Sequence, residues 1–416
     1  MTVKGPSGWR RLTAAFSTLS LKAHPALFAV IMGTGSVSNL LHIFPYGKGS
    51  RGLMIASLAF FFLNLILFCI FFFLALAKYV MHPDRWKAVI YSPVTSPYLG
   101  TFPMGLTTLI NVAVEVINIH FEFGGKGFLY FIWAVWWLDV IMSALCCWVG
   151  VHAMMVNQKH SLDTMSARWL LPVVTLIVAS SSGGVLAPAI QKYSTYHCLI
   201  TTVASVFLVA VGLTLALMVL TIYLARLIIH NIPPGHGVLS VFLPLGPTGQ
   251  AGFAILLQGL SFKTILPYSH SGSSEFLGSS TVGDFLYLAC ISIAFILWSL
   301  ATMWMMYALL ACHSTVFRAP VQFKIAFWGL VFPNGVYANL TILLGEIFDS
   351  HAFRIYGAIY ACAVIVLWAS IAARSLVDIK ELITRSNELP FEAPSQSSSA
   401  GTSQTDLGFK QKEGSG

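Results

Sequence analysis

Nine uncharged polar side chains lie within apolar segments that are long enough to cross a membrane. They are Thr34, Ser36, Thr107, Asn111, Ser181, Thr248, Gln250, Asn334 and Asn339. Hydroxyl and amide groups donate hydrogen bonds to an anion, whereas a fixed Lys or Arg at low dielectric constant would hold a doubly negative oxyanion tightly and slow its release. Because almost no Lys or Arg falls near the middle of these segments, we expect the nine side chains to line a pathway that anions can leave.

Charged residues are expected at the two ends of that pathway. We place Lys22, His24 and Lys324 at the inner mouth and Lys192 at the outer mouth, where they would concentrate anions. The alternative for each is an interfacial side chain whose charged end reaches water.

Two acids also lie in apolar segments, Asp139 near the middle of the fourth and Glu115 toward the outer end of the third. A carboxylate is costly in lipid unless it is neutral or hydrogen-bonded. Either acid is a candidate carrier of a coupling proton. The alternative, favoured for Asp139, is a structural hydrogen bond to a neighbouring helix.

The segments that carry the polar side chains begin with a shared signature of an apolar residue, Pro, any residue and Gly. It occurs at residues 102–105, 243–246 and 332–335, and two further segments begin with a related proline. The five prolines, Pro25, Pro103, Pro172, Pro244 and Pro333, are separated by 78, 69, 72 and 89 residues. A repeat of this length fits a pair of membrane helices, so the pattern predicts ten spans built as five hairpins.

The composition indicates that most of the chain faces lipid. It is 57% hydrophobic and 9% charged, with a mean hydropathy of +0.79, whereas soluble domains contain about 25% charged residues. Spans are expected at about residues 24–44, 52–79, 98–119, 127–153, 167–190, 195–230, 239–262, 281–312, 322–345 and 352–379. They must be helices, because lipid leaves no water for unpaired backbone groups. The predicted fold class is therefore an all-α integral membrane protein.

The odd-numbered and even-numbered spans differ in chemistry. Odd-numbered spans carry the prolines, the small residues and the polar side chains, whereas the even-numbered ones are richer in Phe and Leu. We expect an inner ring of five odd-numbered helices around a central pore and an outer ring of even-numbered helices. The five prolines would kink the inner helices at similar depths, and their positive N-terminal ends at the cytoplasmic mouth would favour anions. The alternative is that the prolines serve folding only.

The distribution of Lys and Arg predicts the orientation of the chain in the membrane. With a cytoplasmic N-terminus, 17 of these residues fall inside and 6 outside, so both termini are expected in the cytoplasm of a multi-pass plasma-membrane protein. Because the basic residues are spread over many loops, the net charge of +8 indicates topology and no nucleic-acid partner. We expect a cytoplasmic segment at 1–21, a transmembrane domain at 22–384 and a disordered cytoplasmic tail at 385–416.

The sequence offers no constellation typical of an enzyme. Its histidines are scattered, mostly at span ends, and its seven cysteines show no metal-ligand or disulfide spacing. We therefore expect no catalytic residues, no metal and no cofactor. A receptor is the other class considered, but five repeated hairpins with polar linings suit a conduit better than a signalling bundle.

Three motifs carry a resemblance to a known family. They are Ile232-Pro233-Pro234 followed by Val241-Phe242-Leu243-Pro244-Leu245-Gly246-Pro247-Thr248-Gly249-Gln250, His24-Pro25 leading to Met32-Gly33-Thr34-Gly35, and Thr101-Phe102-Pro103-Met104-Gly105. Over about residues 20–380 the chain resembles the fungal sulfite efflux pumps of the tellurite-resistance and dicarboxylate transporter family. That family includes fungal malate permeases and plant slow anion channels. The resemblance implies ten helices around a pore in each protomer of a homo-oligomer, usually a trimer.

In the anion-channel branch, a Phe of the ninth helix plugs the pore, and the matching position is Phe332. An aromatic ring beside a helix bend can close a pore by steric blockage and dewetting. The alternatives are that Phe332 is a core aromatic residue, or that Phe102, which also precedes a proline, is the equivalent position.

The resemblance and the neutral lining together predict sulfite or bisulfite efflux driven by the membrane potential and the concentration gradient. A divalent anion leaving an inside-negative cell gains about 4.6 kcal/mol per 100 mV, so export needs no coupled proton. The alternatives are proton-coupled uptake of a dicarboxylate such as malate, or a less selective anion channel. The lack of an Arg at the middle of any span argues against a carboxylate, which Arg would bind through two hydrogen bonds.

Overall fold

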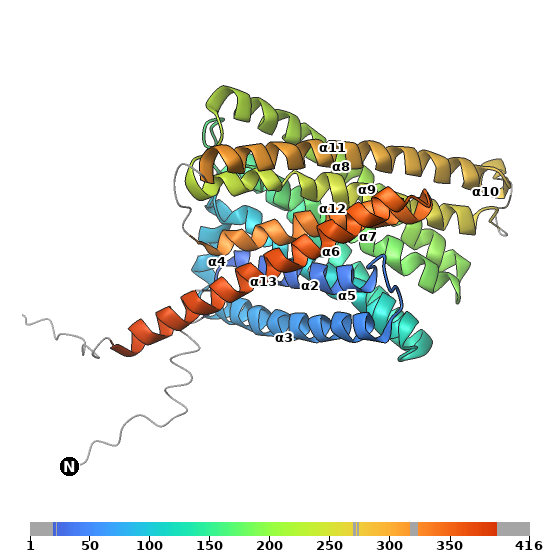
Figure 1. Cartoon of the computed structure of the whole chain (residues 1–416), viewed down its shortest axis with the longest axis horizontal. Helices are drawn as coiled ribbons and strands as arrows, with labels where there is room; N and C mark the ends of the chain where they lie inside the picture. Colours follow the sequence, from blue (N-terminus) through green and yellow to red (C-terminus); the bar gives the residue numbers. More distant parts are fainter. Residues whose placement is uncertain (1–19, 22, 269–271, 273, 317–322, 389–416) are drawn as a thin grey trace, which may run out of the picture. The chain divides into compact units, whose positions relative to one another are not determined.

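The computed structural model of the chain describes residues 20–21, 23–268, 272, 274–316 and 323–388, and these residues contain helices and no strand. Figure 1 follows the helices from α2 in blue to α13 in red. The α-helices are α2 (Phe28–His42), α3 (Arg51–Met81), α4 (Pro83–Tyr91), α5 (Thr101–Val112), α6 (Gly125–Asn157), α7 (Leu170–Gln191), α8 (Thr195–His230), α9 (Leu245–Ile265), α10 (Glu275–Gly278), α11 (Val282–Val316), α12 (Val331–Ile347) and α13 (His351–Glu388). The chain divides into two compact units, residues 1–373 and 374–416.

Nine helical segments in the described part of the chain are long and apolar enough to cross a membrane. They coincide with nine of the ten expected spans. The remaining expected span, the first, corresponds to α2, which has only 15 residues. With the 3-10 turn before it, this first segment is helical from Pro25 to His42, and its role as a tenth span stays a prediction.

The spans form two classes by burial, which follow the difference in composition. Between 67% and 94% of the most apolar window is buried in Ser96–His120, Ala167–Gln191, Gly237–Ile265 and Ile325–Ile347. The corresponding share is 17% to 33% in the other five, and α2 is buried throughout except at its last two residues. The polar, glycine-rich helices are therefore covered by protein, whereas the Phe-rich and Leu-rich helices present apolar side chains outward, as lipid requires.

The five buried helices contact one another in a closed order. Helix α2 contacts α5, α5 contacts α7, α7 contacts α9, α9 contacts α12, and α12 returns to α2. Glycines allow this close approach: a Cβ added to Gly335 on α12 would lie 1.9 Å from Ser36 Oγ on α2, and one added to Gly35 would lie 2.1 Å from Thr108 Oγ1 on α5. Small residues at these positions let the helix backbones approach closely.

Each buried helix is preceded by a turn of 3-10 helix. These turns are η1 (Pro25–Leu27), η2 (Ser96–Gly100), η4 (Ala167–Trp169), η5 (Gly235–Phe242) and η6 (Ile325–Leu330). The five prolines stand close to these junctions: Pro25 begins η1, Pro244 is the residue before α9, and the other three are the third residues of α5, α7 and α12. Proline is tolerated there because the first turn of a helix has no intrahelical partner for its N–H groups. The prolines thus mark the change from 3-10 to α winding at the helix starts, and the expected bends at these positions stay a prediction.

Two features of the backbone have no counterpart in the sequence-based expectation. The second half of the third span is a π-helix, η3 (Ala113–His120), which carries Glu115. A short helix, α4, follows α3 and has one buried residue, Val89.

Candidate anion pathway

A small cavity lies where the five buried helices meet, and all five contribute to its wall. The wall is formed by Gly35, Ser36, Asn39, Thr107, Thr108, Asn111, Val178, Gln250, Phe253, Phe332, Val336 and Asn339. We call this space the central cavity. Its volume of about 20 Å³ holds roughly one water molecule, so the pathway is closed to any larger solute in this conformation.

The wall of the central cavity contains five of the nine polar residues predicted from the sequence. They are Ser36, Thr107, Asn111, Gln250 and Asn339. The structure adds Asn39 and Thr108, which had not been selected. Both additions follow helical spacing: Asn39 is three residues after Ser36, and Thr108 is three residues before Asn111, so each shares a face with a predicted residue.

The other four predicted residues lie outside this wall. Thr34 accepts a hydrogen bond of 3.1 Å from the indole of Trp368, and Asn334 Oδ1 accepts one of 2.6 Å from the Tyr360 hydroxyl, so both hold their helices against α13. The other two, Ser181 and Thr248, also have partners. Ser181 Oγ accepts a hydrogen bond from the Gln250 amide, and the Thr248 hydroxyl donates to the carbonyl of Pro244 at 2.8 Å.

Several polar atoms in the central cavity have no protein partner among the described residues. The atoms that are buried and have no hydrogen-bond partner are Ser36 Oγ, Asn39 Oδ1, Gln250 Oε1 and Asn339 Oδ1. Buried polar groups in proteins are nearly always hydrogen-bonded, so unpaired groups gathered on one cavity indicate a polar solute as the missing partner. Three of these four atoms are amide oxygens, which accept hydrogen bonds, and the Gln250 amide already donates to Ser181. The donors that an anion can accept from are therefore the Ser36 hydroxyl and the N–H groups that Asn39 and Asn339 carry beside their unpaired oxygens.

A larger cavity of about 300 Å³ lies at the helix starts and is walled by residues of η2, η4, η5 and η6. We call it the vestibule. Phe332 borders both the vestibule and the central cavity, and it is the one described residue common to both walls. Its side chain is 6% exposed. An aromatic ring therefore lies at the junction of a wide space and a narrow polar one. Phe102 borders neither of these and instead lines a separate, largely apolar cavity.

Asp139 lies one side chain behind the wall of the central cavity. It is fully buried on α6, and the hydroxyl of Thr107 donates to its Oδ2 at 2.9 Å. Its other oxygen has no partner among the described residues. Glu115 is on the π-helix, outside the walls of both cavities, and its Oε2 is also buried and unpaired.

None of the described cations expected at the pathway mouths lines the vestibule or the central cavity, and one of the expected cations falls outside the described residues. That one is Lys22. His24 caps η1 by accepting a hydrogen bond of 3.0 Å from the Ala26 amide, and burial, with a smaller effect of Lys78, lowers its pKa, so it carries little charge at neutral pH. Lys324 is exposed just before η6, outside the vestibule wall, and Lys192 lines a separate cleft at the far ends of the helices.

Among the described residues, Arg168 on η4 and Arg226 near the end of α8 are the cations that line the vestibule. Sequence reasoning counted both as charges on the cytoplasmic side and did not assign them to the pathway. The sequence carries one local indication that these residues could reach the pathway. Each lies within a few residues of a break in an apolar segment, where a long side chain can turn toward the axis.

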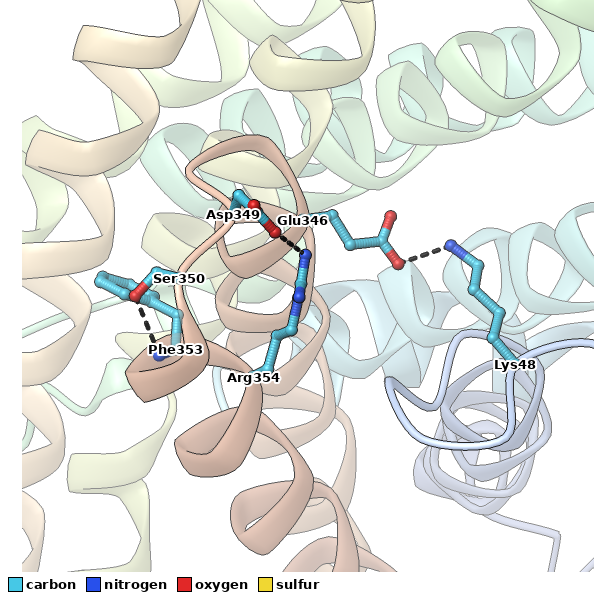
Figure 2. A network of polar contacts seen from close by, with 6 residues as sticks. All are labelled: Lys48, Glu346, Asp349, Ser350, Phe353 and Arg354. Carbon is cyan, nitrogen blue, oxygen red and sulfur yellow. Dashed lines mark hydrogen bonds and ion pairs between the residues drawn. The ribbon is translucent and has the colours of Figure 1, made fainter.

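At the opposite end of the buried helices, polar contacts fix the turn that joins α12 to α13 (Figure 2). Lys48, in the segment between α2 and α3, pairs with Glu346 near the end of α12 at 2.5 Å. Within the turn, Arg354 pairs with Asp349 at 2.5 Å, and Ser350 Oγ accepts a hydrogen bond from the amide of Phe353. The Lys48–Glu346 pair therefore anchors the segment after α2 to the end of α12, on the side remote from the vestibule.

Comparison with known proteins identifies the family of this chain. The chain is 35% identical over 351 residues to the sulfite efflux pump SSU1 of Trichophyton rubrum, which covers 84% of this chain and 89% of the relative. It is 33% identical over 350 residues to the sulfite efflux pump SSU1 of Arthroderma otae, with the same coverage, and 24% identical over 349 residues to the malic acid transport protein of Schizosaccharomyces pombe, covering 82% and 75%. The family model described as SLAC1, voltage-dependent anion channel, matches residues 22–376. The family match covers nearly the whole helical region of this multi-pass membrane protein. This chain belongs to the SLAC1 family of anion channels and transporters and is not an enzyme.

Proposed function

We propose that this protein exports sulfite or bisulfite through a pathway that runs from the vestibule, past Phe332, into the central cavity. The observation that carries the proposal is the wall of the central cavity, where the described residues include the unpaired Ser36 hydroxyl and the amides of Asn39 and Asn339 and no charged side chain. Such a wall binds an oxyanion weakly enough to release it. The fungal relatives named as sulfite efflux pumps support sulfite as the anion.

The proposed architecture is five helical hairpins, with the buried helices as an inner ring around the pore and the exposed helices as an outer ring. The closed order of contacts among α2, α5, α7, α9 and α12 supports it, as does the alternation of buried and exposed spans along the chain.

Phe332 is the proposed gate. A space that holds roughly one water molecule excludes sulfite, so the ring must move before an anion passes. Since Phe332 follows directly on the junction of η6 and α12, a small change in that junction displaces the ring without disturbing the rest of the helix. Gating by a bulky apolar side chain acts through steric closure and through exclusion of water.

Export requires no coupled proton. An inside-negative potential of 100 mV contributes about 2.3 kcal/mol for each negative charge that leaves. We place the protein in the plasma membrane as a homo-oligomer, a trimer by family resemblance, with the vestibule and both termini cytoplasmic. The excess of Lys and Arg on that side supports the orientation.

Flux measurements in reconstituted vesicles test this function. Sulfite, sulfate, nitrate, chloride and malate are compared in competition, with and without an imposed potential. The proposal expects sulfite to be preferred and its flux to follow the potential. Flux that ignores the potential would contradict electrogenic export, and similar rates for all small anions would indicate a less selective channel.

Dicarboxylate transport is the second candidate function, because two observations favour it. One relative is named a malic acid transport protein, and the vestibule contains two Arg side chains, the residue type that binds carboxylates through paired hydrogen bonds. Malate that outcompetes sulfite in the same experiment, with flux that follows a proton gradient, would establish this alternative.

A further inference from the structure

Arg226 is a buried cation in the wall of the vestibule. Its side chain is 7% exposed, although it lies only four residues before the end of α8. Two hydrogen bonds hold its guanidinium in place: Nη1 donates to the carbonyl of Asn231 at 2.6 Å, and Nη2 donates to the carbonyl of Asp163 at 2.9 Å. Both acceptors are neutral backbone groups, and Nε has no partner among the described residues.

No carboxylate pairs with this charge in the described part of the chain. The four ion pairs found there involve other residues, and the vestibule wall contains two Arg and no Asp or Glu. Asp163 contacts Arg226 through its backbone carbonyl, while its own carboxylate lies in an exposed loop. A buried charge without a counter-charge is strongly unfavourable, so the site is electrostatically incomplete.

Arg168 contributes a second guanidinium to the same wall. Its Nε donates to Ser166 Oγ at 2.9 Å, which fixes the plane of the group and leaves the Nη atoms available. Ser166 and Ser240 also line the vestibule, so two hydroxyl groups share its wall with the two guanidinium groups. Guanidinium groups bind planar or pyramidal oxyanions through parallel N–H donors, which is the chemistry of a small oxyanion site.

We propose that Arg226 and Arg168 form an oxyanion-binding site in the vestibule, which loads the transported anion before Phe332 opens. The inference rests on the proposed function, because it takes sulfite as the ligand. The anion supplies the missing counter-charge of Arg226, and the site is separated from the weak neutral wall of the central cavity by one aromatic ring. The anion is thus bound tightly in the vestibule and weakly in the central cavity of the same pathway.

The site predicts a specific kinetic signature. Sulfite export measured from the vestibule side saturates, and Arg168→Gln raises the half-saturating concentration about tenfold, as expected for the loss of one charge-assisted contact, while the maximal rate stays within about twofold. Arg226→Gln produces the same shift. Arg226→Lys recovers part of it, because Lys keeps the charge and loses the fork geometry. The matched control is Lys87→Gln on α4, an exposed cation at the same end of the helices and outside the vestibule wall.

Calorimetry on the purified full-length protein measures sulfite binding separately from sulfite transport. The wild type binds with a heat that Arg168→Gln and Arg226→Gln reduce and Lys87→Gln leaves unchanged. Size-exclusion profiles and thermal midpoints identify any variant that fails to fold. Arg168→Gln carries the test if Arg226→Gln is lost, because the Arg168 guanidinium donates to the side-chain hydroxyl of Ser166, whereas Arg226 holds two backbone carbonyls.

The possible results distinguish this inference from the proposed function. If both Gln variants export sulfite at the wild-type rate and with the wild-type concentration dependence, the vestibule site is overturned and sulfite export is not affected. Wild-type protein that moves malate and not sulfite overturns the proposed substrate, and sulfite as the ligand of the site falls with it. A shift as large for Lys87→Gln as for Arg168→Gln overturns the site in favour of a diffuse surface potential.

Discussion

The hydroxyl of Thr107 lies 2.9 Å from Oδ2 of Asp139 and 3.1 Å from the carbonyl oxygen of Pro103. A hydroxyl has one proton and can serve only one of these acceptors at a time. Thr107 faces the central cavity, whereas Asp139 stands behind it on α6. The pair therefore connects the pathway wall to an outer helix.

Asp139→Asn separates a structural role for this acid from proton coupling. The amide donates to Thr107, which then donates to the Pro103 carbonyl, so we expect sulfite flux within about twofold of the wild type. Asp139→Leu leaves Thr107 without that partner and lowers the free energy of unfolding by about 1–3 kcal/mol, measured by thermal denaturation in detergent. Loss of a pH-dependent component of flux in Asp139→Asn alone would instead identify Asp139 as a proton carrier.

Phe332→Ala opens the junction between the vestibule and the central cavity. We expect basal anion leak to rise about tenfold, equivalent to lowering a barrier by ~1.4 kcal/mol, when measured as current or vesicle flux without any activating stimulus. Phe28→Ala is the matched control, because Phe28 is similarly buried on α2 and borders neither space. Equal leak in the two variants would show that general loosening, rather than removal of a gate, is responsible.

Gly335→Ala places a methyl group 1.9 Å from Ser36 Oγ and forces α12 away from α2. We expect the free energy of unfolding to fall by about 1–3 kcal/mol, as for other overpacked helix contacts. Adding Ser36→Gly removes the obstructing side chain and restores part of the loss. Gly127→Ala on α6 is the control, because a Cβ there meets no atom within 4 Å. A Gly335→Ala protein as stable as the wild type would argue against this close contact.

His24 predicts a pH dependence of stability. Burial, with a smaller effect of Lys78, lowers its pKa in the folded protein below the ordinary value of 6.5, so the unfolded chain binds more protons below that value. The contribution of His24 is complete above about pH 6.5 and declines as the pH falls through the lowered folded pKa. Thermal midpoints between pH 8 and 5 measure this trend. His24→Asn, which can still cap Ala26, reduces the slope, and an unchanged slope would assign the dependence to other groups.

The contrast between buried and exposed helices was predictable, because glycine, proline and polar residues are concentrated in one set of segments and Phe in the other. The direction of each side chain around its helix was less so. Thr34 and Asn334 are polar residues on buried helices, yet Trp368 and Tyr360 draw them toward α13. A single sequence indicates the depth of a residue in the membrane, whereas the direction of its side chain around the helix axis depends on the neighbouring helix.

The mouth cations show the same limitation more sharply. The sequence places Lys324 and Arg226 at one end of the helices, and only the fold reveals which lies in the vestibule wall. Arg226 turns inward because its hydrogen-bond acceptors, the carbonyls of Asp163 and Asn231, come from irregular segments whose paths no periodicity predicts. The central cavity, in contrast, is built from regular helices, and five of the polar residues in its wall are among the nine that the sequence analysis selected.

The tighter winding of η6 gives the residue after it a means of rotating. A 3-10 helix turns about 120° per residue and rises about 2.0 Å, whereas an α-helix turns about 100° and rises about 1.5 Å. Rewinding the 6 residues of Ile325–Leu330 would shorten that stretch by about 3 Å and swing whatever follows through roughly a third of a revolution. A short axial displacement of this stretch at the membrane surface can therefore rotate the aromatic ring of Phe332, two residues beyond it.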